Sequence, residues 1–256
     1  MFTRAIVRPP GRNFADGLTT VNLGTPDYEI TLRQHNAYCE ALRSLGLTLT
    51  ALPVDEQFPD STFVEDTAIL TERLAVITRP GAVSRQGEID SIKIVLARLF
   101  GEFRFIEAPG TVDGGDVCEA GDHFFIGISE RTNEAGAEQL AAILAAFEYT
   151  SSFVDIRQIK SILHLKSGLS YVGEGQLVVF DELAEMDEFS GYELIKVDAG
   201  DEYAANCVLV NDSVLVAAGY PAFSARLKNF GHRTIEIEMS EFQKMDGGLS
   251  CLSLRF

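Results

Sequence analysis

The stretch Thr111–Phe147, TVDGGDVCEAGDHFFIGISERTNEAGAEQLAAILAAF, contains the pattern that decides the fold. A short segment with two aspartates leads into an apolar run, HFFIGI, which is followed by a polar loop and an amphipathic segment. In that last segment Leu140, Leu144 and Phe147 recur at steps of four and three, which is typical of one face of an α-helix. The order of strand, loop and helix predicts one unit of a mixed α/β fold.

Similar units occur elsewhere in the chain. Residues 63–100, which begin FVEDTAIL, follow the same order, and residues 203–231, which begin YAANCVLV, form a third copy. Two shorter segments, HLKSGLSYVGEGQLVVF (164–180) and GGLSCLSLRF (247–256), match only the beginning of the pattern. The chain therefore contains about five units of roughly 40–50 residues, a period that is typical of repeat architectures.

Each unit has polar side chains at the start of its first strand. In chain order, they are Asp66, Asp113 with Asp116, His164, Asn206 and Cys251. If the units are arranged around one axis, we expect these side chains to converge at its centre.

Helices and strands are predicted in the rest of the chain. A helix is expected after Thr25 as its cap and Pro26 as its first residue, ending at Gly46. A second helix is expected over Gly87–Phe100, and a third after a cap at Thr132. Apolar runs predict strands at 5–7, 47–52, 63–70, 74–78, 123–128, 162–166, 169–172, 176–180, 206–210, 213–219 and 234–238.

Length and charge limit the possible functions. The chain has 256 residues, enough for a sizeable core, and we predict a single domain over residues 1–256. Asp and Glu number 38 against 21 Lys and Arg, which gives a formal net charge of −17. Such a chain is poorly suited to nucleic acid or an anionic membrane, since both require a basic surface. It is compatible with a small cationic ligand.

The sequence also predicts a cytoplasmic protein. Arg4 and Arg8 interrupt the first residues where a signal peptide would be apolar, and no run of residues is long and apolar enough to span a membrane. The four cysteines are scattered and form no CxxC motif, so we expect reduced thiols.

Three residue types suggest covalent catalysis. Cys251, after two glycines, could be an accessible nucleophile or simply a small residue in a strand. His164 could move protons for that thiol or be a core histidine in an apolar strand. Asp113 and Asp116 flank two glycines, and either could orient His164, although a glycine-rich turn with aspartate caps is also common.

Charged residues suggest a ligand with a guanidinium and a carboxylate. Asp60, Glu65 and Asp66 lie within FPDSTFVED, where they could pair with a planar guanidinium or form a solvated acidic loop. Arg85 and Arg131 occupy matching places before two predicted helices, so they could clamp a carboxylate or lie on the surface.

A zinc site is a weaker alternative. Cys118 and His123 are two potential ligands without a second pair, which falls short of four-coordinate spacing. We therefore predict no zinc site.

Ordered motifs along nearly the whole chain resemble the dimethylarginine dimethylaminohydrolases, which belong to the guanidino-group-modifying superfamily. The motifs are FPDSTFVED, ITRPGAVSR, TVDGGD, ISERTN, LHLKSGL, YAANC, AAGYP and DGGLSCLSLRF. This resemblance implies a five-fold pseudo-symmetric α/β propeller, the pentein fold, which fits the repeat. It also implies an enzyme without metal or cofactor, acting on a small cationic guanidino substrate, and a possible homodimer.

The resemblance implies a role for each candidate residue. Cys251 would be the nucleophile, His164 the general acid and base, and Asp113 the carboxylate that orients the histidine. The substrate-binding residues would be Asp66 with Glu65 for the guanidinium, Arg85 and Arg131 for the α-carboxylate, and Asp60, Leu18, Met245 and Asp246 for the α-amino group. Leu18 lies in FADGLTTVNLG, whose glycines suit a mobile lid.

The implied reaction is hydrolysis of Nω-methylated arginine to citrulline and methylamine or dimethylamine, through a covalent thiouronium on Cys251. Arginine deiminase and agmatine deiminase are the nearest alternatives, although an agmatine enzyme would have no use for Arg85 and Arg131. A non-catalytic propeller that binds the ribosome would need neither Cys251 nor His164. A cysteine amidase of another fold would leave the acidic residues and paired arginines unexplained.

Overall fold

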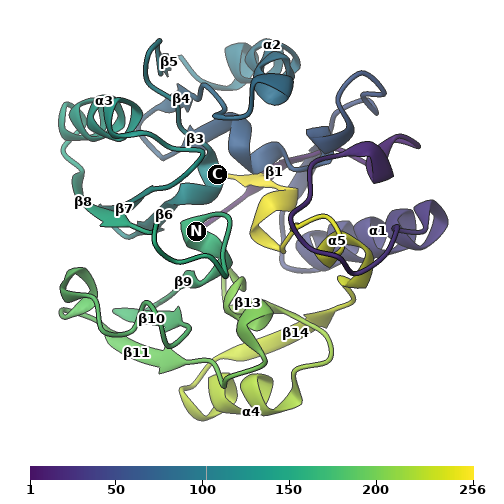
Figure 1. Cartoon of the computed structure of the whole chain (residues 1–256), viewed down its shortest axis with the longest axis vertical. Helices are drawn as coiled ribbons and strands as arrows, with labels where there is room; N and C mark the ends of the chain where they lie inside the picture. Colours follow the sequence, from purple (N-terminus) through teal and green to yellow (C-terminus); the bar gives the residue numbers. More distant parts are fainter. Residues whose placement is uncertain (102) are drawn as a thin grey trace.

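Five three-stranded sheets surround a common axis in the computed structural model, which describes residues 1–101 and 103–256 (Figure 1). From the inner to the outer strand, the sheets have the orders β15-β1-β2, β3-β4-β5, β6-β7-β8, β9-β10-β11 and β12-β13-β14. The strands are β1 (Arg4–Val7), β2 (Thr48–Ala51), β3 (Ala68–Leu70), β4 (Ala75–Ile77), β5 (Phe103–Phe105), β6 (Val117–Ala120), β7 (His123–Ile128), β8 (Thr150–Asp155), β9 (Leu169–Gly173), β10 (Gln176–Val179), β11 (Glu193–Lys196), β12 (Val208–Val210), β13 (Ser213–Ala217), β14 (Arg233–Ile237) and β15 (Leu254–Arg255).

Every sheet repeats one connection. Its inner and middle strands are antiparallel, whereas its middle and outer strands are parallel and therefore need a crossover. Helices provide four of these crossovers, namely α1 (Tyr28–Ser44), α2 (Ile89–Leu99), α3 (Glu134–Ala145) and α4 (Pro221–Asn229), and they lie at the rim in Figure 1. The sheet of β9, β10 and β11 has a 3₁₀ helix, Asp187–Phe189, in this connection instead. A short helix, α5 (Ser240–Gln243), precedes β15 in the chain.

The apolar periodicity that identifies α3 in the sequence also builds the core. Leu140 and Leu144 are fully buried against Ile126 of β7 and Val117 of β6. Strands β7 and β8 pair in register from His123 with Thr150 to Ile128 with Asp155. Because burying each large aliphatic side chain contributes roughly 1.5–3 kcal/mol, the helix is held on its sheet mainly by this apolar face.

The sheet of β15, β1 and β2 joins the two ends of the chain. Strand β1 is antiparallel to β15, with Ala5 opposite Arg255, and parallel to β2, with Ala5 opposite Leu49. Both chain ends accordingly lie near the centre of Figure 1. This pairing closes the ring, and the predicted five-fold α/β propeller is confirmed.

A 3₁₀ turn precedes the inner strand of each sheet. The five turns are Val64–Thr67, Gly114–Asp116, Leu165–Ser167, Glu202–Ala205 and Ser250–Leu252. The turn Val64–Thr67 contacts both Gly114–Asp116 and Ser250–Leu252, although the three are far apart in sequence. The polar residues that recur in the sequence repeat lie on or directly beside these turns, so they surround the axis.

The turns also correct two strand predictions. Residues 63–67 were expected to continue into β3, and residues 162–166 were expected to be a strand around His164. Instead, Val64–Thr67 is a 3₁₀ turn, and His164 is the residue before the turn Leu165–Ser167. Apolar neighbours produced the strand signal in both segments, but here they fill the packed centre of the ring. Strands β5, β8 and β11 were not predicted, since their alternation with charged or small residues is a weaker signal, and β6 and β15 were expected only as the short first strands of their repeat units.

Two helix starts differ from the prediction. Asp27, not Thr25, caps α1, because its carboxylate accepts a hydrogen bond from the Ile30 amide. Pro26 therefore lies before the helix. Asn133, not Thr132, caps α3 by accepting from the Gly136 amide, while Thr132 is buried and its hydroxyl accepts from the Asp113 amide instead. In both cases a better acceptor follows the predicted cap by one or two residues.

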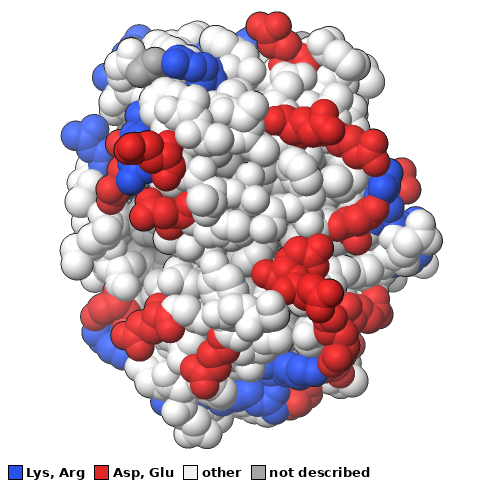
Figure 2. Space-filling view, turned by 90° about the vertical axis from the view of Figure 1, so that its left-hand side faces the viewer, with Lys and Arg blue, Asp and Glu red and all other residues white. Residues whose placement is uncertain are grey.

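Among the described residues, no helix combines the length and apolar character that crossing a membrane requires. On the side face in Figure 2, acidic side chains are widely spread, with basic ones gathered mainly near its margins. This distribution agrees with the net charge of −17.

Candidate active site

His164 and Asp113 form a buried pair at the axis. Nε2 of His164 lies 3.0 Å from Oδ2 of Asp113, and the other oxygen of Asp113 accepts a hydrogen bond from the Gly81 amide at 2.8 Å. Burial alone would lower the pKa of His164, but the carboxylates of Asp66, Asp116 and Asp113 outweigh it and raise that pKa to about 9. The imidazole is therefore protonated at neutral pH.

Asp116 is equally buried but contacts different groups. Its carboxylate accepts hydrogen bonds from the Ser129 hydroxyl at 2.6 Å and the Leu165 amide at 3.0 Å. Burial raises its pKa to about 6, although the charge of His164 opposes the shift. Of the two aspartates that the sequence left open, Asp113 is the one in contact with His164.

Asp66 is held as a carboxylate facing the same centre. Its Oδ1 accepts a hydrogen bond from the Gly115 amide at 2.8 Å, and its Oδ2 lies 2.5 Å from Nη1 of Arg85. Burial would raise its pKa, but Arg85 and His164 lower it to about 2. A Cβ on Gly115 would lie only 2.8 Å from the His164 ring, so this glycine permits the close approach that TVDGGD suggested.

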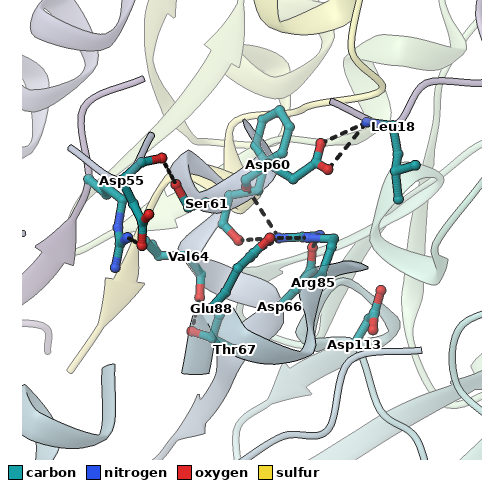
Figure 3. A network of polar contacts seen from close by, with 12 residues as sticks. Leu18, Asp55, Asp60, Ser61, Val64, Asp66, Thr67, Arg85, Glu88 and Asp113 are labelled. Carbon is teal, nitrogen blue, oxygen red and sulfur yellow. Dashed lines mark hydrogen bonds and ion pairs between the residues drawn. The ribbon is translucent and has the colours of Figure 1, made fainter. Parts of the chain in front are cut away.

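Arg85 lies in a buried network with carboxylates and main-chain oxygens (Figure 3). Its Nε and Nη2 donate to Glu88 at 3.0 and 2.8 Å, and Nη2 also donates to the carbonyl oxygens of Phe63 and Asp60. Together with the pair to Asp66, these bonds tie Arg85 to three points of the segment 60–66. In this arrangement, Arg85 fixes the acidic segment, and one hydrogen on Nη1 has no acceptor among the described residues.

Arg131 differs from Arg85 in its surroundings. It is half-buried, and its guanidinium has no ion pair within the described part of the chain. Burial raises the pKa of Asp60, whereas the charges of Arg85 and Arg131 lower it, which places both arginines within electrostatic reach of that carboxylate. A Cβ on Gly81 would lie 2.2 Å from the Arg131 carbonyl oxygen, so close packing fixes the Arg131 backbone.

The glycine-containing loop 17–24 lies over this region. The Leu18 amide donates to both carboxylate oxygens of Asp60, at 3.0 and 3.2 Å (Figure 3). Thr20 donates to Asp246 through its amide and its hydroxyl, at 2.5 and 3.0 Å. Met245 is itself buried in the core beside α1. The loop thus connects Leu18 and Asp60 with Asp246, and Met245 is the chain neighbour of Asp246.

A cavity of about 500 Å³ lies beside the loop. Its lining includes Thr20 and Leu23 of the loop, Asp246, Asn206 and Gly248. The side chains of Leu18 and Leu23 remain 42% and 52% exposed, so the loop is only lightly packed on the rest of the protein. A loop in such a position is suited to act as a lid.

Glu65 faces the axis from the same turn as Asp66. One of its oxygens accepts from Nζ of Lys166 at 2.6 Å, and the other accepts from the Ser250 hydroxyl at 2.7 Å. Arg255 is a further cation, 3.7 Å away. Both oxygens of Glu65 therefore already have protein partners.

Cys251 lies in the middle of the turn Ser250–Leu252 and is half-buried. Its Sγ accepts a hydrogen bond from the Gly248 amide at 3.4 Å. Burial, together with the charges of Glu65 and Asp66, raises the pKa of the thiol to about 12. The thiol is therefore neutral in the free protein, and a cation bound near the two carboxylates would favour the thiolate.

One group of side chains has the spacing of a metal site. Ligand atoms of Asp66, Asp113 and His164 lie within 4.8 Å of one another. Each carboxylate oxygen in this group already accepts from a protein donor, so a metal would have to replace those bonds. Cys118 and His123, the other zinc candidates, belong to β6 and β7, where Cys118 is buried and His123 pairs with Thr150.

Sequence reasoning missed several residues of the site. Glu88, three residues after Arg85, completes the ion-pair network, and that spacing on one helical turn was an available signal. Lys166 and Ser250 carried no such signal, because their contacts with Glu65 join turns that are 101 and 185 residues apart.

The chain is similar to proteins of known name. A family model described as arginine deiminase matches residues 54–206. The N(G),N(G)-dimethylarginine dimethylaminohydrolase of Pseudomonas aeruginosa is 46% identical over 257 residues, covering 100% of both chains, and that of Streptomyces coelicolor is 36% identical over 255 residues, covering 98% and 96%.

Solved structures agree with these relatives. A mutant of the Pseudomonas aeruginosa enzyme complexed with citrulline has a TM-score of 0.97 and covers 100% of both chains at 46% identity. The N-terminal domain of ArgZ, a cyanobacterial arginine dihydrolase, has a TM-score of 0.88 at 17% identity and covers 98% and 97%, which shows a shared fold. By identity over its full length and by fold, this chain belongs to the dimethylarginine dimethylaminohydrolase family of the guanidino-group-modifying superfamily.

Proposed function

We propose that this protein hydrolyses Nω-methylated L-arginine to L-citrulline and dimethylamine or methylamine. The observation that carries the proposal is the arrangement at the axis, where the ionised carboxylate of Asp66, the His164–Asp113 pair and Cys251 occupy neighbouring turns. Family membership supports the same activity, since relatives with this name are 46% and 36% identical to the chain.

The protonation states explain why the enzyme would require a cationic substrate. In the free protein Cys251 is a thiol and His164 an imidazolium, since their pKa values are about 12 and about 9. Attack requires a thiolate. A guanidinium bound beside Asp66 and Glu65 cancels part of the negative charge that raises the thiol pKa, so ionisation of Cys251 becomes easier once the substrate is bound. The thiol proton passes to solvent, because His164 is already protonated.

The reaction then proceeds in two balanced halves. The Cys251 thiolate adds to the guanidinium carbon to give a tetrahedral adduct, and His164 transfers its proton to the methylated nitrogen, which leaves as the free amine. A covalent thiouronium remains. Neutral His164 next removes a proton from water, and the hydroxide adds to the thiouronium carbon. Collapse breaks the carbon–sulfur bond and releases citrulline, while the hydroxyl proton of the adduct passes to the departing sulfur, so the thiol and the imidazolium of the free protein are restored.

The other end of the substrate would lie towards the loop 17–24. Arg131, whose guanidinium has no ion pair among the described residues, is suited to the α-carboxylate. Arg85 would contribute the remaining hydrogen of Nη1 while it holds the acidic segment in place. Asp60, Asp246, the Leu18 backbone and the Met245 backbone would accept from the α-amino group.

The purified protein tests this proposal directly. With asymmetric dimethylarginine it should release citrulline and dimethylamine in equal amounts, and Cys251→Ser should reduce the rate to background. Cys39→Ser, which alters a buried cysteine of α1, is the matched control and should retain activity. Full activity of Cys251→Ser would contradict the assignment of the nucleophile.

A substrate panel separates this function from its nearest alternatives. Monomethylarginine and dimethylarginine should be turned over faster than arginine, and agmatine should be poorest, because it has no carboxylate for Arg131. Faster release of ammonia from arginine would instead identify an arginine deiminase.

We further propose a homodimer in the cytoplasm. The four unpaired cysteines favour a reducing compartment. Light scattering across a concentration series checks the oligomeric state, and cell fractionation checks the location.

A further inference from the structure

Asn206 is a buried amide at the axis for which the proposed reaction has no role. It follows the turn Glu202–Ala205 and is 5% exposed. Its Nδ2 donates to the carbonyl oxygen of Lys166 at 2.8 Å and to the Ser250 hydroxyl at 3.0 Å, while its Oδ1 accepts from the Ser250 amide at 3.0 Å. The side chain therefore uses both donor hydrogens and its acceptor.

These bonds connect the two segments that carry the reacting groups. Lys166 is two residues after His164 and belongs to the turn Leu165–Ser167. Ser250 directly precedes Cys251 in the turn Ser250–Leu252. Because one rigid amide bonds to both backbones, it limits how far the histidine turn and the cysteine turn can move relative to each other.

Asn206 also packs on the backbone that contacts the sulfur. A Cβ on Gly248 would lie 2.4 Å from Cγ and Oδ1 of Asn206, so no larger residue fits between them. The Gly248 amide donates to Sγ of Cys251. The position of this donor thus depends on the Asn206 side chain beneath it.

The contacts continue into a closed circuit. The Ser250 hydroxyl donates to Glu65, and Lys166 Nζ donates to the other oxygen of Glu65. Asn206 closes the circuit through its bonds to Ser250 and to the Lys166 carbonyl. These four side chains belong to turns of four different sheets. Asn206 is the one that bonds to the backbone of both neighbouring turns, at the Lys166 carbonyl and the Ser250 amide.

We propose that Asn206 is a positioning residue that sets the placement of Cys251 relative to His164. The inference rests on the proposed hydrolysis, in which the thiolate attacks and the imidazolium protonates the leaving amine. Both steps depend on geometry, since a displacement of about 1 Å can cost about 100-fold in rate. Asn206 touches neither the substrate nor the sulfur in this scheme.

Two variants separate positioning from simple stabilisation. Asn206→Ala removes every bond of the amide, whereas the nearly isosteric Asn206→Asp keeps the acceptor for Ser250 and places an oxygen against the Lys166 carbonyl. Gln34→Ala is the matched control, because Gln34 is 6% exposed and its amide similarly donates to the Ser240 hydroxyl and accepts from the Glu241 amide.

Steady-state kinetics and thermal unfolding should be measured together on all three variants. We expect kcat to fall by about 10- to 100-fold for both Asn206 variants, with KM changed by less than about threefold. Gln34→Ala should lose a similar amount of Tm while kcat stays within about twofold of the unmutated protein. Equal kcat losses in Asn206→Ala and Gln34→Ala, or an unchanged kcat in Asn206→Asp, would overturn the proposal.

Alkylation of Cys251 by iodoacetamide distinguishes failure of this inference from failure of the proposed function. The assay needs no substrate, so it remains informative even if the unmutated protein releases no citrulline. Loss of the amide beneath Gly248 should expose the half-buried thiol and raise its alkylation rate by at least about threefold in Asn206→Ala but not in Gln34→Ala. Equal alkylation rates would contradict the placement role independently of turnover.

Discussion

At the scale of single residues, Asp113 and Asp116 show how the same side chain is used in two ways. Both are fully buried and both raise the pKa of His164, but only Asp113 contacts the ring. Asp116 instead accepts from Ser129 and Leu165 and so holds the backbone next to the histidine. One carboxylate orients the imidazole, and the other supplies charge.

Asparagine at each position should separate orientation from charge. Both substitutions remove a negative charge, so the pKa of His164 should fall from about 9 in each, as measured by NMR titration of the imidazole. A smaller fraction of His164 is then protonated at pH 8. The kcat of each variant should therefore decline with rising pH at values where His164 of the unmutated protein is still protonated.

The rates at pH 6 should differ. Asp113→Asn should lose about 100- to 1000-fold in kcat, within the range of a general acid–base group, whereas Asp116→Asn should lose about tenfold or less. The same loss in both variants would show that Asp113 acts only through its charge.

The candidate site residues could be predicted from the sequence, whereas most of the contacts that they make could not. Asp66, Asp113, His164 and Cys251 could be identified because polar groups recur at one place in an apolar repeat. Their partners could not, since Lys166, Ser250 and Glu88 become relevant only after distant turns meet at the axis. The role of Arg85 in fixing the acidic segment depends on burial, which the local sequence does not reveal.

At the scale of elements, the inner 3₁₀ turns position the site. Amphipathic helices and strongly apolar strands such as β7 were predicted, because burial of one face imposes a period on the sequence. The turns Val64–Thr67 and Leu165–Ser167 were not, because apolar neighbours give these segments a strand signal and only contacts between different sheets decide their conformation. Glycine is what lets the inner turns meet, as a Cβ on Gly114 would lie 2.0 Å from the carbonyl oxygen of Glu65.

Gly114→Ala should therefore affect stability and activity together. The obstructing atom belongs to the backbone, so the turn Val64–Thr67 must shift, at a cost of about 1–3 kcal/mol or more in the free energy of unfolding. The shift also displaces Glu65 and Asp66, so kcat/KM should fall by at least about tenfold.

Gly191→Ala is the matched control, because a Cβ there meets no atom within 4 Å. Urea unfolding and steady-state kinetics check both variants. If Gly114→Ala unfolds at the same urea concentration as Gly191→Ala, the close packing of the turns is not a constraint.

At the scale of the whole molecule, the net charge of −17 and the cationic substrate belong together. Some of the acidity is used at the axis by Glu65, Asp66 and Asp113, and the rest is spread over surfaces such as the face in Figure 2. A field of this sign attracts a substrate with a net positive charge and raises its local concentration.

Salt should therefore weaken substrate capture. Raising the ionic strength from about 0.01 M to about 0.15 M shortens the Debye length from about 30 Å to about 8 Å, so kcat/KM for dimethylarginine should fall several-fold. The inhibition constant of citrulline, which has no net charge, should change less and provides the control. If kcat/KM does not depend on salt, the surface charge does not help to capture the substrate, and only the carboxylates at the axis attract it.

The pairing of β1 with β15 has a consequence for the order in which the protein becomes an enzyme during synthesis. The proposed nucleophile precedes β15, and that strand completes a sheet to which β1, made much earlier, also belongs. The carboxylates, the histidine and the asparagine are therefore translated before the thiol has a place in the ring. A ribosome that stalls before β15 would leave a nascent chain with four complete sheets, an unfinished fifth and no working catalyst, so activity would appear in a single step once β15 pairs with β1.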